Sequence, residues 1–535
     1  MQWPRLILAS ILALLIGVPV LLAPPRQVAP SGDATTLVIF TPHHESIRQE
    51  FKRAFEAWHL RTYGTSATVA WATPGGTSEI RKMLEAAFIG ALRRGAEPGG
   101  QADLLFGGGS YEFTQLARTL EAGGPGSATT TVLAPLPLDA ATLAEAYGGR
   151  TLIGDTPLYD PKGMWYGAAL SGFGIVYNRD LLSELGVPEP TRWADLCDAR
   201  LVGWVALVNP AQSGSVTTAY EAILQRRGWT DGWRILRRMA ANARTFSASA
   251  PKAPTDVSLG EAAAGICIDF YGRYQSQAMI DAGDLRADGK PRVGYIDPPG
   301  ETVIDPDPVA MLRGAPNPEL AERFVRFVLS VEGQALWNFE AKVHRSGGSA
   351  VADDLGPERH ELRRMPIRPS LYADHFDRLI DRVDPYAVAT AVESPNRFFR
   401  SFLPPTFVAM AIENRSLIRE AWLAIIEHPA YPDEPDSGIV TAADVTDPTL
   451  KAMLEAFDAM PMIPGPDGES IALADERNLE RLRDGWLRGG WKDEELWPAD
   501  AARTEVLRSI MTAFFRLQYE RVLELSAAHG SGGQG

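Results

Sequence analysis

Two adjacent histidines and a glutamate, His43, His44 and Glu45, stand between an apolar run and the start of a predicted helix. The run Leu37–Phe40 has no polar alternation, which is typical of a strand buried on both faces in a parallel sheet. Ser46 has a glutamine three residues further on, the capping-box spacing that begins a helix. Ligands bind beyond the carboxyl ends of strands in open α/β sheets, and a helix N-terminus offers unpaired N–H groups. The loop therefore suggests a ligand site, although histidines are also ordinary surface-loop residues.

Three further loops repeat this pattern of an apolar run, small hydroxyl-bearing or glycine residues, and a helix start. They are Pro74–Ser78, Gly107–Ser110 and Asn209–Ser215. Glycines let a ligand approach the main chain, and serine and threonine hydroxyls with free N–H groups suit an anion. The spacing is neither that of a phosphate-binding P-loop nor that of a dinucleotide fingerprint. The loops predict a ligand cleft built from main-chain groups, with Ser213–Ser215 as its strongest single element.

An exported metallohydrolase is an alternative from another class of function. The side chains of His43, His44, Glu45, Asp305 and Asp307 would have to gather a divalent ion. However, the histidines are adjacent and lack the HExxH spacing that puts two imidazoles on one helix face. The chain also has no GxSxG nucleophile elbow. We therefore expect a binding protein rather than an enzyme.

The bulk properties limit the remaining possibilities. The chain has 535 residues, enough for two or more hydrophobic cores, and a net charge of −15, which argues against nucleic acid as a partner. Its only cysteines, Cys197 and Cys267, both lie in apolar surroundings. We expect two buried free thiols, with a single disulfide as the alternative.

The N-terminal segment predicts export. Arg5 precedes the mostly apolar stretch 6–23, and the Pro-containing stretch 24–34 reads as a tether. The apolar run suits a secretion signal or an uncleaved single-pass anchor, and its length favours the anchor. The expected location is the periplasm, with a tether to the inner membrane.

Six segments together resemble the bacterial extracellular solute-binding proteins of ABC importers, in the branch that holds the ferric-iron, thiamine and phosphonate binders. They are LVIFTPHHESI, DLLFGGGSYEF, GFGIVYNRDLL, LVNPAQSGS, GEAAAGICIDFYGRY and PDPVAMLRGAPNPELAERFVRFVLSVEGQALW. The resemblance spans about residues 36–349. It implies an α/β, two-lobed periplasmic-binding-protein (type II) fold that traps its ligand by hinge closure. It also implies an ABC permease and its ATPase as partners, no cofactor, and a monomer.

The implied organisation has five parts. They are a signal or anchor and tether (1–35), the first part of lobe one (36–178), lobe two (179–296), the return to lobe one (297–350) and a mostly helical C-terminal extension (351–535). We expect the extension to pack against lobe one.

The resemblance also assigns ligand contacts. They are Thr41, His43, His44, Gly108, Gly109 and Ser110 from lobe one, Ser213, Gly214, Ser215 and Tyr271 from lobe two, and Asp305 or Asp307 near the hinge. We expect a small oxyanion such as a phosphonate, a phosphate ester or phosphate, with help from Arg273. The alternative is ferric iron held by His44, Tyr271 and Tyr274, but Phe270 stands where that branch has an adjacent second tyrosine.

Overall fold

The computed structural model describes residues 34–123, 126–345, 354–432, 439–491 and 503–532. The predicted N-terminal signal or anchor lies outside the described residues. Within them, none of the helices combines the length and the apolarity that a membrane crossing requires.

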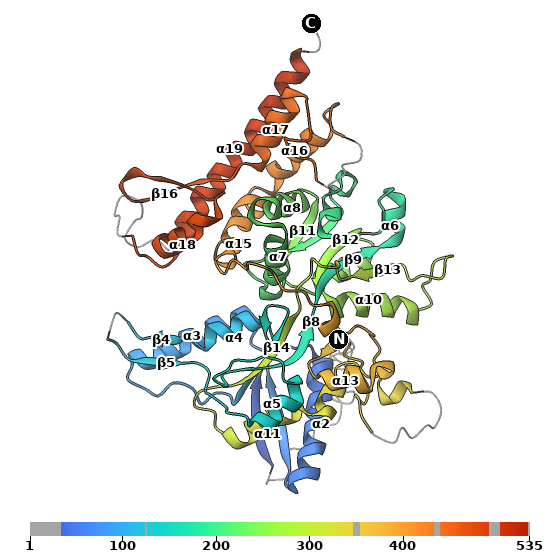
Figure 1. The fold of residues 1–535 in the computed structure, drawn as a ribbon, viewed down its shortest axis with the longest axis vertical. Helices are drawn as coiled ribbons and strands as arrows, with labels where there is room; N and C mark the ends of the chain where they lie inside the picture. The colour runs from blue at the N-terminus through green and yellow to red at the C-terminus, as the bar shows by residue number, and fades with distance from the viewer. Residues whose placement is uncertain (1–33, 124–125, 346–353, 433–438, 492–502, 533–535) are drawn as a thin grey trace, which may run out of the picture.

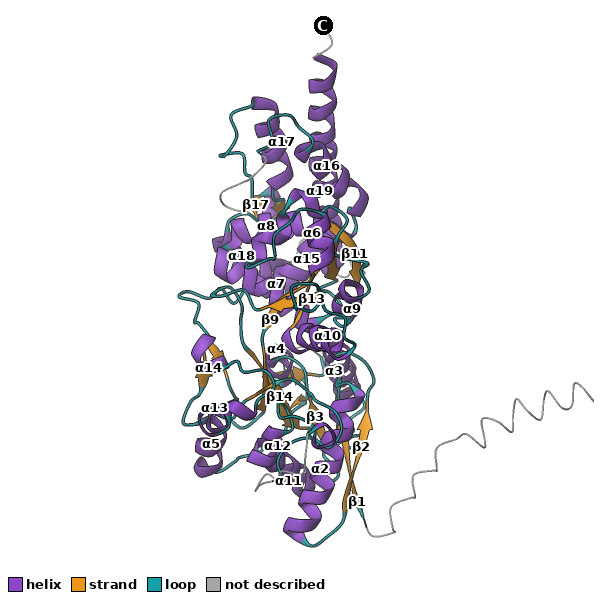
Figure 2. Cartoon of the chain, turned by 90° about the vertical axis from the view of Figure 1, so that its right-hand side faces the viewer, coloured by secondary structure: helices purple, strands orange, loops and turns teal. Residues whose placement is uncertain are grey.

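Two separate sheets form the centres of two lobes, stacked along the long axis of the molecule (Figures 1 and 2). The lobe-one sheet has the order β15-β8-β14-β3-β1-β2, and the lobe-two sheet has the order β11-β10-β12-β9-β13. Strands β1, β2 and β3 are parallel, as are β10, β11 and β12, while β8, β9, β13 and β14 pair antiparallel to their neighbours. The lobe-one strands are β1 (Thr35–Phe40), β2 (Ala67–Ala72), β3 (Leu104–Phe106), β8 (Tyr166–Ser171), β14 (Asp305–Met311) and β15 (Met365–Pro366). The lobe-two strands are β9 (Phe173–Asn178), β10 (Val205–Val208), β11 (Ala243–Ser247), β12 (Ala264–Ile268) and β13 (Val293–Ile296).

Helices cover both faces of each sheet because the connections between parallel strands must cross over it. Lobe one has α2 (Glu45–Tyr63), α3 (Thr77–Arg93), α4 (Ser110–Leu116), α5 (Ala140–Tyr147), α11 (Pro318–Leu329) and α12 (Val331–Ala335). Lobe two has α6 (Arg179–Glu184), α7 (Gly214–Arg227), α8 (Trp229–Ala241), α9 (Lys252–Ser258) and α10 (Asp269–Asp281). The small two-stranded sheets are β4 (Thr119–Glu121) with β5 (Thr129–Thr131), β6 (Leu152–Ile153) with β7 (Thr156–Pro157), and β16 (Met462–Pro464) with β17 (Ser470–Ala472).

The chain crosses between the lobes at Gly172, which lies between β8 and β9. The predicted boundary after residue 178 is wrong, because Phe173–Asn178 pairs with β12 and β13 in the lobe-two sheet. The two strands are equally buried and apolar, so their sequence does not say which sheet each joins. The chain returns to lobe one between β13 and β14. The two-lobed α/β architecture is thus the one that the resemblance implies.

The C-terminal extension packs mainly on lobe two, so the expectation that it covers lobe one is wrong for most of its length. Its helices are α13 (Pro369–Asp374), α14 (Pro385–Val388), α15 (Phe399–Phe407), α16 (Arg415–Ile426), α17 (Pro448–Asp458), α18 (Leu479–Leu482) and α19 (Arg503–Gly532). Buried side chains from α15 to α19 belong to the same hydrophobic core as those of α7 and α8. Only the beginning of the extension joins lobe one, where β15 pairs with β8. Figure 1 shows α16, α17 and α19 at the lobe-two end of the molecule.

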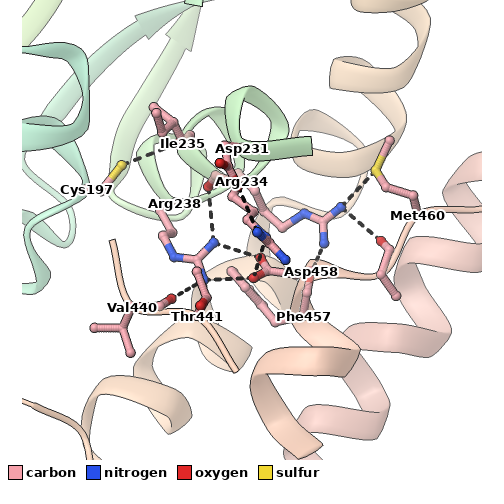
Figure 3. A network of polar contacts seen from close by, with 12 residues as sticks. Cys197, Asp231, Arg234, Ile235, Arg238, Val440, Thr441, Phe457, Asp458 and Met460 are labelled. Carbon is pink, nitrogen blue, oxygen red and sulfur yellow. Dashed lines mark hydrogen bonds and ion pairs between the residues drawn. The ribbon is translucent and has the colours of Figure 1, made fainter. Parts of the chain in front are cut away.

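Two buried arginines on α8 fix this packing. The Arg238 guanidinium donates to the Asp458 carboxylate at 2.7 Å and to the Val440 carbonyl at 2.6 Å. Arg237 donates to the carbonyls of Phe457 and Ala459. Figure 3 shows the Arg238 contacts, in which Asp458 and Val440 of the extension accept from this lobe-two arginine. A buried charge needs such partners, so α8 and the extension have to fold as one unit.

Both cysteines are buried and free, which confirms the expected pair of unlinked thiols. Burial raises the pKa of the Cys197 thiol to about 12.

Candidate functional site

A cavity of about 540 Å³ lies between the two lobes. The loops after β1, β2, β3, β10, β11 and β12 open into it, as does the start of β14. Its lining residues are Pro42, His43, His44, Ile47, Thr73, Gly75, Gly76, Thr77, Glu79, Gly108, Gly109, Ser171, Phe173, Gln212, Ser213, Gly214, Ser215, Ala248, Ser249, Ala250, Pro251, Ile268, Phe270, Tyr271, Asp305, Pro306, Asp307 and Arg364. Cavities at domain interfaces are common ligand sites.

Four long helices begin at this cavity. The residues that precede α2, α3, α7 and α10 are His44, Gly76, Ser213 and Ile268, and all four line the cavity. The first N–H groups of a helix have no partner within it and carry a partial positive charge. At α10 the Asp269 N–H already donates to the Gly172 carbonyl and the Phe270 N–H to the Asp269 carboxylate. The starts of α2, α3 and α7 are therefore the better placed donors for a negatively charged ligand.

Helix α2 starts one residue before the predicted cap, Ser46. Helix α2 begins at Glu45, and the His44 imidazole, rather than Ser46, accepts from a first-turn N–H. Helix α3 begins at Thr77, with the Glu79 carboxylate accepting from the Gly76 N–H at 3.0 Å. Histidine is a rare cap, which is why the serine spacing was the stronger signal.

The Ser213–Ser215 loop places two hydroxyls at the start of α7. The Ser213 and Ser215 hydroxyl oxygens are 3.2 Å apart, and Ser213 also accepts from the Val216 N–H. Gly214 lies close to lobe one, since a Cβ at this position would be 3.0 Å from both the Glu112 carboxylate and the Ser78 hydroxyl. This loop therefore faces the cavity and also meets the opposite lobe.

The glycine loop after β3 has no space for a side chain at Gly107. Gly107 has φ +101°, and a Cβ there would lie 2.5 Å from the His43 imidazole. Gly108 and Gly109 line the cavity, but Ser110 does not. Instead, the Ser110 hydroxyl donates to Asp305 at 2.6 Å and its N–H donates to the same carboxylate at 3.1 Å. Burial raises the pKa of Asp305 to about 6, against the effect of these two hydrogen bonds.

A buried cation, Arg364, stands at the lobe-one wall of the cavity. Its guanidinium forms an ion pair with Asp307 and donates to the Ser171 hydroxyl at 2.8 Å. It also lies 3.0 Å from Nε2 of His43. Burial lowers the pKa of His43, so the imidazole is neutral near pH 7. The same Nε2 lies 3.3 Å from the Asp307 carboxylate, so His43, Asp307 and Arg364 form one buried polar cluster. Although burial opposes it, the charge of Arg364 lowers the pKa of Asp307.

The residues of the iron alternative do not come together. Tyr271 lines the cavity and stacks on Phe270, with ring centroids 4.1 Å apart. Tyr274 is 57% exposed and does not line the cavity. Burial also raises the pKa of the Tyr271 phenol. Arg273 is absent from the lining, because its guanidinium pairs with Asp269 and, at 2.6 Å, with Asp297.

The predicted contacts fall into two groups. His43, His44, Gly108, Gly109, Ser213, Gly214, Ser215, Tyr271, Asp305 and Asp307 line one cavity. Thr41 and Ser110 lie behind its wall, where the Thr41 hydroxyl accepts from the His43 N–H at 3.1 Å. Contact of these residues with a ligand remains a prediction.

The sequence reasoning missed Arg364, and it named no single ligand contact in the Pro74–Ser78 loop before α3. The only signal for Arg364 is the basic run 361–368. The Gly-Gly-Thr-Ser pattern had, however, already placed this loop among the four loops that predict a ligand cleft. Within the described residues, no three histidine, cysteine, aspartate or glutamate side chains gather as a metal would require. The residues named for a metallohydrolase therefore do not form a cluster there.

Comparison with known proteins agrees with this architecture. Residues 137–354 match the family model of bacterial extracellular solute-binding proteins. This part of the chain is thus similar to that family, as the resemblance of its motifs predicted.

The chain is similar to a curated protein from Salmonella typhimurium, the phosphoglycerate transport regulatory protein PgtC. The two are 29% identical over 203 residues, which is 38% of this chain and 47% of that protein. The chain thus matches about half the length of this relative.

Two solved structures are also similar. The periplasmic binding protein AfuA from Actinobacillus pleuropneumoniae, with exogenous fructose-6-phosphate bound, is 20% identical with a TM-score of 0.43, covering 56% of this chain and 81% of that chain. Iron-bound HitA from Pseudomonas aeruginosa is 19% identical with a TM-score of 0.41, covering 56% and 82%.

Proposed function

We propose that this protein is the substrate-binding component of an ABC-type importer. It captures a small oxyanion between its lobes in the periplasm and delivers it to a permease with its ATPase. The observation that carries the proposal is the convergence of the N-termini of α2, α3 and α7 on one inter-lobe cavity. Main-chain N–H groups and the Ser213 and Ser215 hydroxyls can hold phosphate-like oxygens without a lysine. The protein does this as a monomer and without catalysis, tethered by its N-terminal segment.

The charges around the cavity favour a phosphate ester over inorganic phosphate. Arg364 is the one arginine or lysine among the lining residues, and its charge is already balanced by Asp307. Asp305 and Glu79 also line the cavity, so a bare polyanion would meet carboxylates. A ligand with one phosphate and several hydroxyls places the phosphate at the helix N-termini and lets a hydroxyl donate to Asp305. The name of the Salmonella relative, which refers to phosphoglycerate, supports this class of ligand.

A thermal-shift screen of the full chain tests the proposal. The panel contains phosphate, phosphonates, hydroxylated phosphate esters such as 3-phosphoglycerate, and ferric citrate. A ligand at about 100 times its Kd stabilises the folded protein by about 2.7 kcal/mol, so a true ligand gives a clear shift in melting temperature. We expect the phosphate esters to give the largest shift.

Two variants locate the binding. Ser213→Ala/Ser215→Ala should weaken the ester by about 1–3 kcal/mol for each lost contact. Ser509→Ala/Ser526→Ala removes two hydroxyls from α19, away from the cavity, and should leave affinity unchanged. Unchanged affinity in the first variant would reject the Ser213–Ser215 loop as the site. A coloured ferric complex that is lost in Tyr271→Phe would show that the ligand is ferric iron and not an oxyanion.

A further inference from the structure

A second cavity, of about 320 Å³, has arginines at five of its eight lining positions. It lies between lobe one and the C-terminal extension, apart from the cleft described above. Its eight lining residues include no acidic side chain. They are Tyr111, Gln115, Arg118, Arg397, Arg400, Ser401, Arg483 and Arg488. Five like charges around one small space repel each other, although the protein as a whole has a net charge of −15.

The carboxylates near these arginines do not neutralise the cavity. Arg483 and Arg488 share Asp484, at 2.7 and 3.5 Å, and Arg397 lies 3.4 Å from Glu480. Arg118 has no ion pair or side-chain hydrogen bond within the described part of the chain. Among the described residues, Arg397, Arg483 and Arg488 therefore have two carboxylates between them, and these residues give the cavity an excess of positive charge.

Arg400 forms the floor of this cavity and connects it to the ligand cleft. Its guanidinium forms an ion pair with Glu221 at 2.9 Å and donates to the Gly214 carbonyl at 3.0 Å. It also stacks over the Tyr111 ring, 4.1 Å from the ring centroid. Tyr111 belongs to lobe one and Arg400 to α15 of the extension, so this contact joins lobe one to the part of the extension that packs on lobe two.

The two walls of the cavity come from parts that hinge motion would separate. Tyr111, Gln115 and Arg118 come from α4 or the residues just after it, and the other arginines come from α15 and the residues around α18. Figure 1 shows α4 on the lobe-one side, facing α15 and α18. A ligand that touches both walls binds the closed arrangement better than an open one.

We propose that this cavity is a second anion site, which takes a small polyvalent phosphate and favours closure of the lobes. Arginine forks bind phosphate oxygens in pairs, and the cavity has room for two linked phosphate groups. Because α4 also begins at the ligand cleft, occupancy of either site raises affinity at the other. The existence of this site does not depend on which ligand the cleft binds.

Calorimetric titration of the full chain with pyrophosphate at fixed ionic strength tests the site. Arg118→Gln/Arg488→Gln removes two exposed cations from opposite walls and should lower pyrophosphate affinity by about tenfold or more. Arg516→Gln/Arg521→Gln makes the same charge change on α19 and should leave it unchanged. Small-angle X-ray scattering should show a smaller radius of gyration when pyrophosphate is added. This decrease should be absent in Arg118→Gln/Arg488→Gln.

Other outcomes overturn the inference. Equal loss of affinity in both arginine variants would mean that pyrophosphate responds only to overall charge. If pyrophosphate affinity falls in Ser213→Ala/Ser215→Ala but not in Arg118→Gln/Arg488→Gln, the anion binds in the ligand cleft. That result would reject the second site and support the proposed function. Binding of dihexanoyl phosphatidylglycerol without binding of pyrophosphate would assign the cavity to a lipid headgroup and reject a soluble ligand.

Discussion

Replacing Arg364 by methionine should destabilise lobe one strongly, because it leaves a buried carboxylate without its cation. Arg364 is 5% exposed and Asp307 is 3% exposed. The change removes the ion pair, the hydrogen bond to Ser171, and the contact with the Phe270 ring at 4.5 Å. Removing one partner of a buried pair costs about 3–5 kcal/mol, far more than a surface charge contributes.

The pH dependence separates this cause from a simple loss of packing. In the wild type the pKa of Asp307 lies below its usual value of 3.8, so its pairing stabilises the fold above about that pH and is lost as the pH falls further. In Arg364→Met, burial without the cation raises the pKa of Asp307. The loss of unfolding free energy in Arg364→Met, relative to the wild type, should therefore be largest near about pH 8. It should shrink towards about pH 5, as Asp307 takes up a proton.

Urea unfolding followed by tryptophan fluorescence measures the effect, because Trp337 packs against Arg364 at 5.6 Å from its ring centroid. Arg359→Met makes the same charge change at an exposed site of the same segment and should cost less than about 0.5 kcal/mol. The double variant Arg364→Met/Asp307→Asn should recover at least half of the loss. A pH-independent deficit, with no recovery in the double variant, would refute the reasoning.

Three further variants test other parts of the structure. Gly214→Ala puts a Cβ 3.0 Å from Glu112, so it should hold the lobes apart and increase the radius measured by scattering. Asp305→Asn should stabilise the fold at about pH 8 by up to about 3 kcal/mol and have little effect near about pH 4. The reason is that the pKa of Asp305, about 6 when folded, exceeds its usual 3.8, so ionisation destabilises the native state as the pH rises between these values. Asp458→Ala leaves the Arg238 charge buried and should lower the stability of lobe two and the extension together by about 3–5 kcal/mol.

Each of these expectations has a clear contrary result. An unchanged radius in Gly214→Ala would mean that the lobes do not close on this contact. A stability gain in Asp305→Asn that is the same at both pH values would exclude ionisation as its cause. Separate unfolding of the extension in Asp458→Ala, with lobe two unaffected, would contradict a shared core.

The sequence alone determined the local units of this protein. Apolar β-branched runs followed by glycine, serine or histidine loops predicted the strand–loop–helix units, because burial on both faces and helix capping depend on neighbouring residues. The same patterns identified the loop around Ser213 and the glycine loop before Ser110. They also supported the two-lobed fold through the resemblance of the motifs.

Only the tertiary structure decided which residues meet. Arg364 and His43 are 321 positions apart in the chain, and no local pattern connects them. Tyr274 follows Tyr271 by one helical turn, yet it points to solvent because only the first turn of α10 faces the cavity. The extension covers lobe two because its apolar side chains share one hydrophobic core with α7 and α8, and it also supplies acceptors for the buried Arg237 and Arg238. Such pairings depend on burial and on distance in space, which hydrophobic periodicity along the chain does not encode.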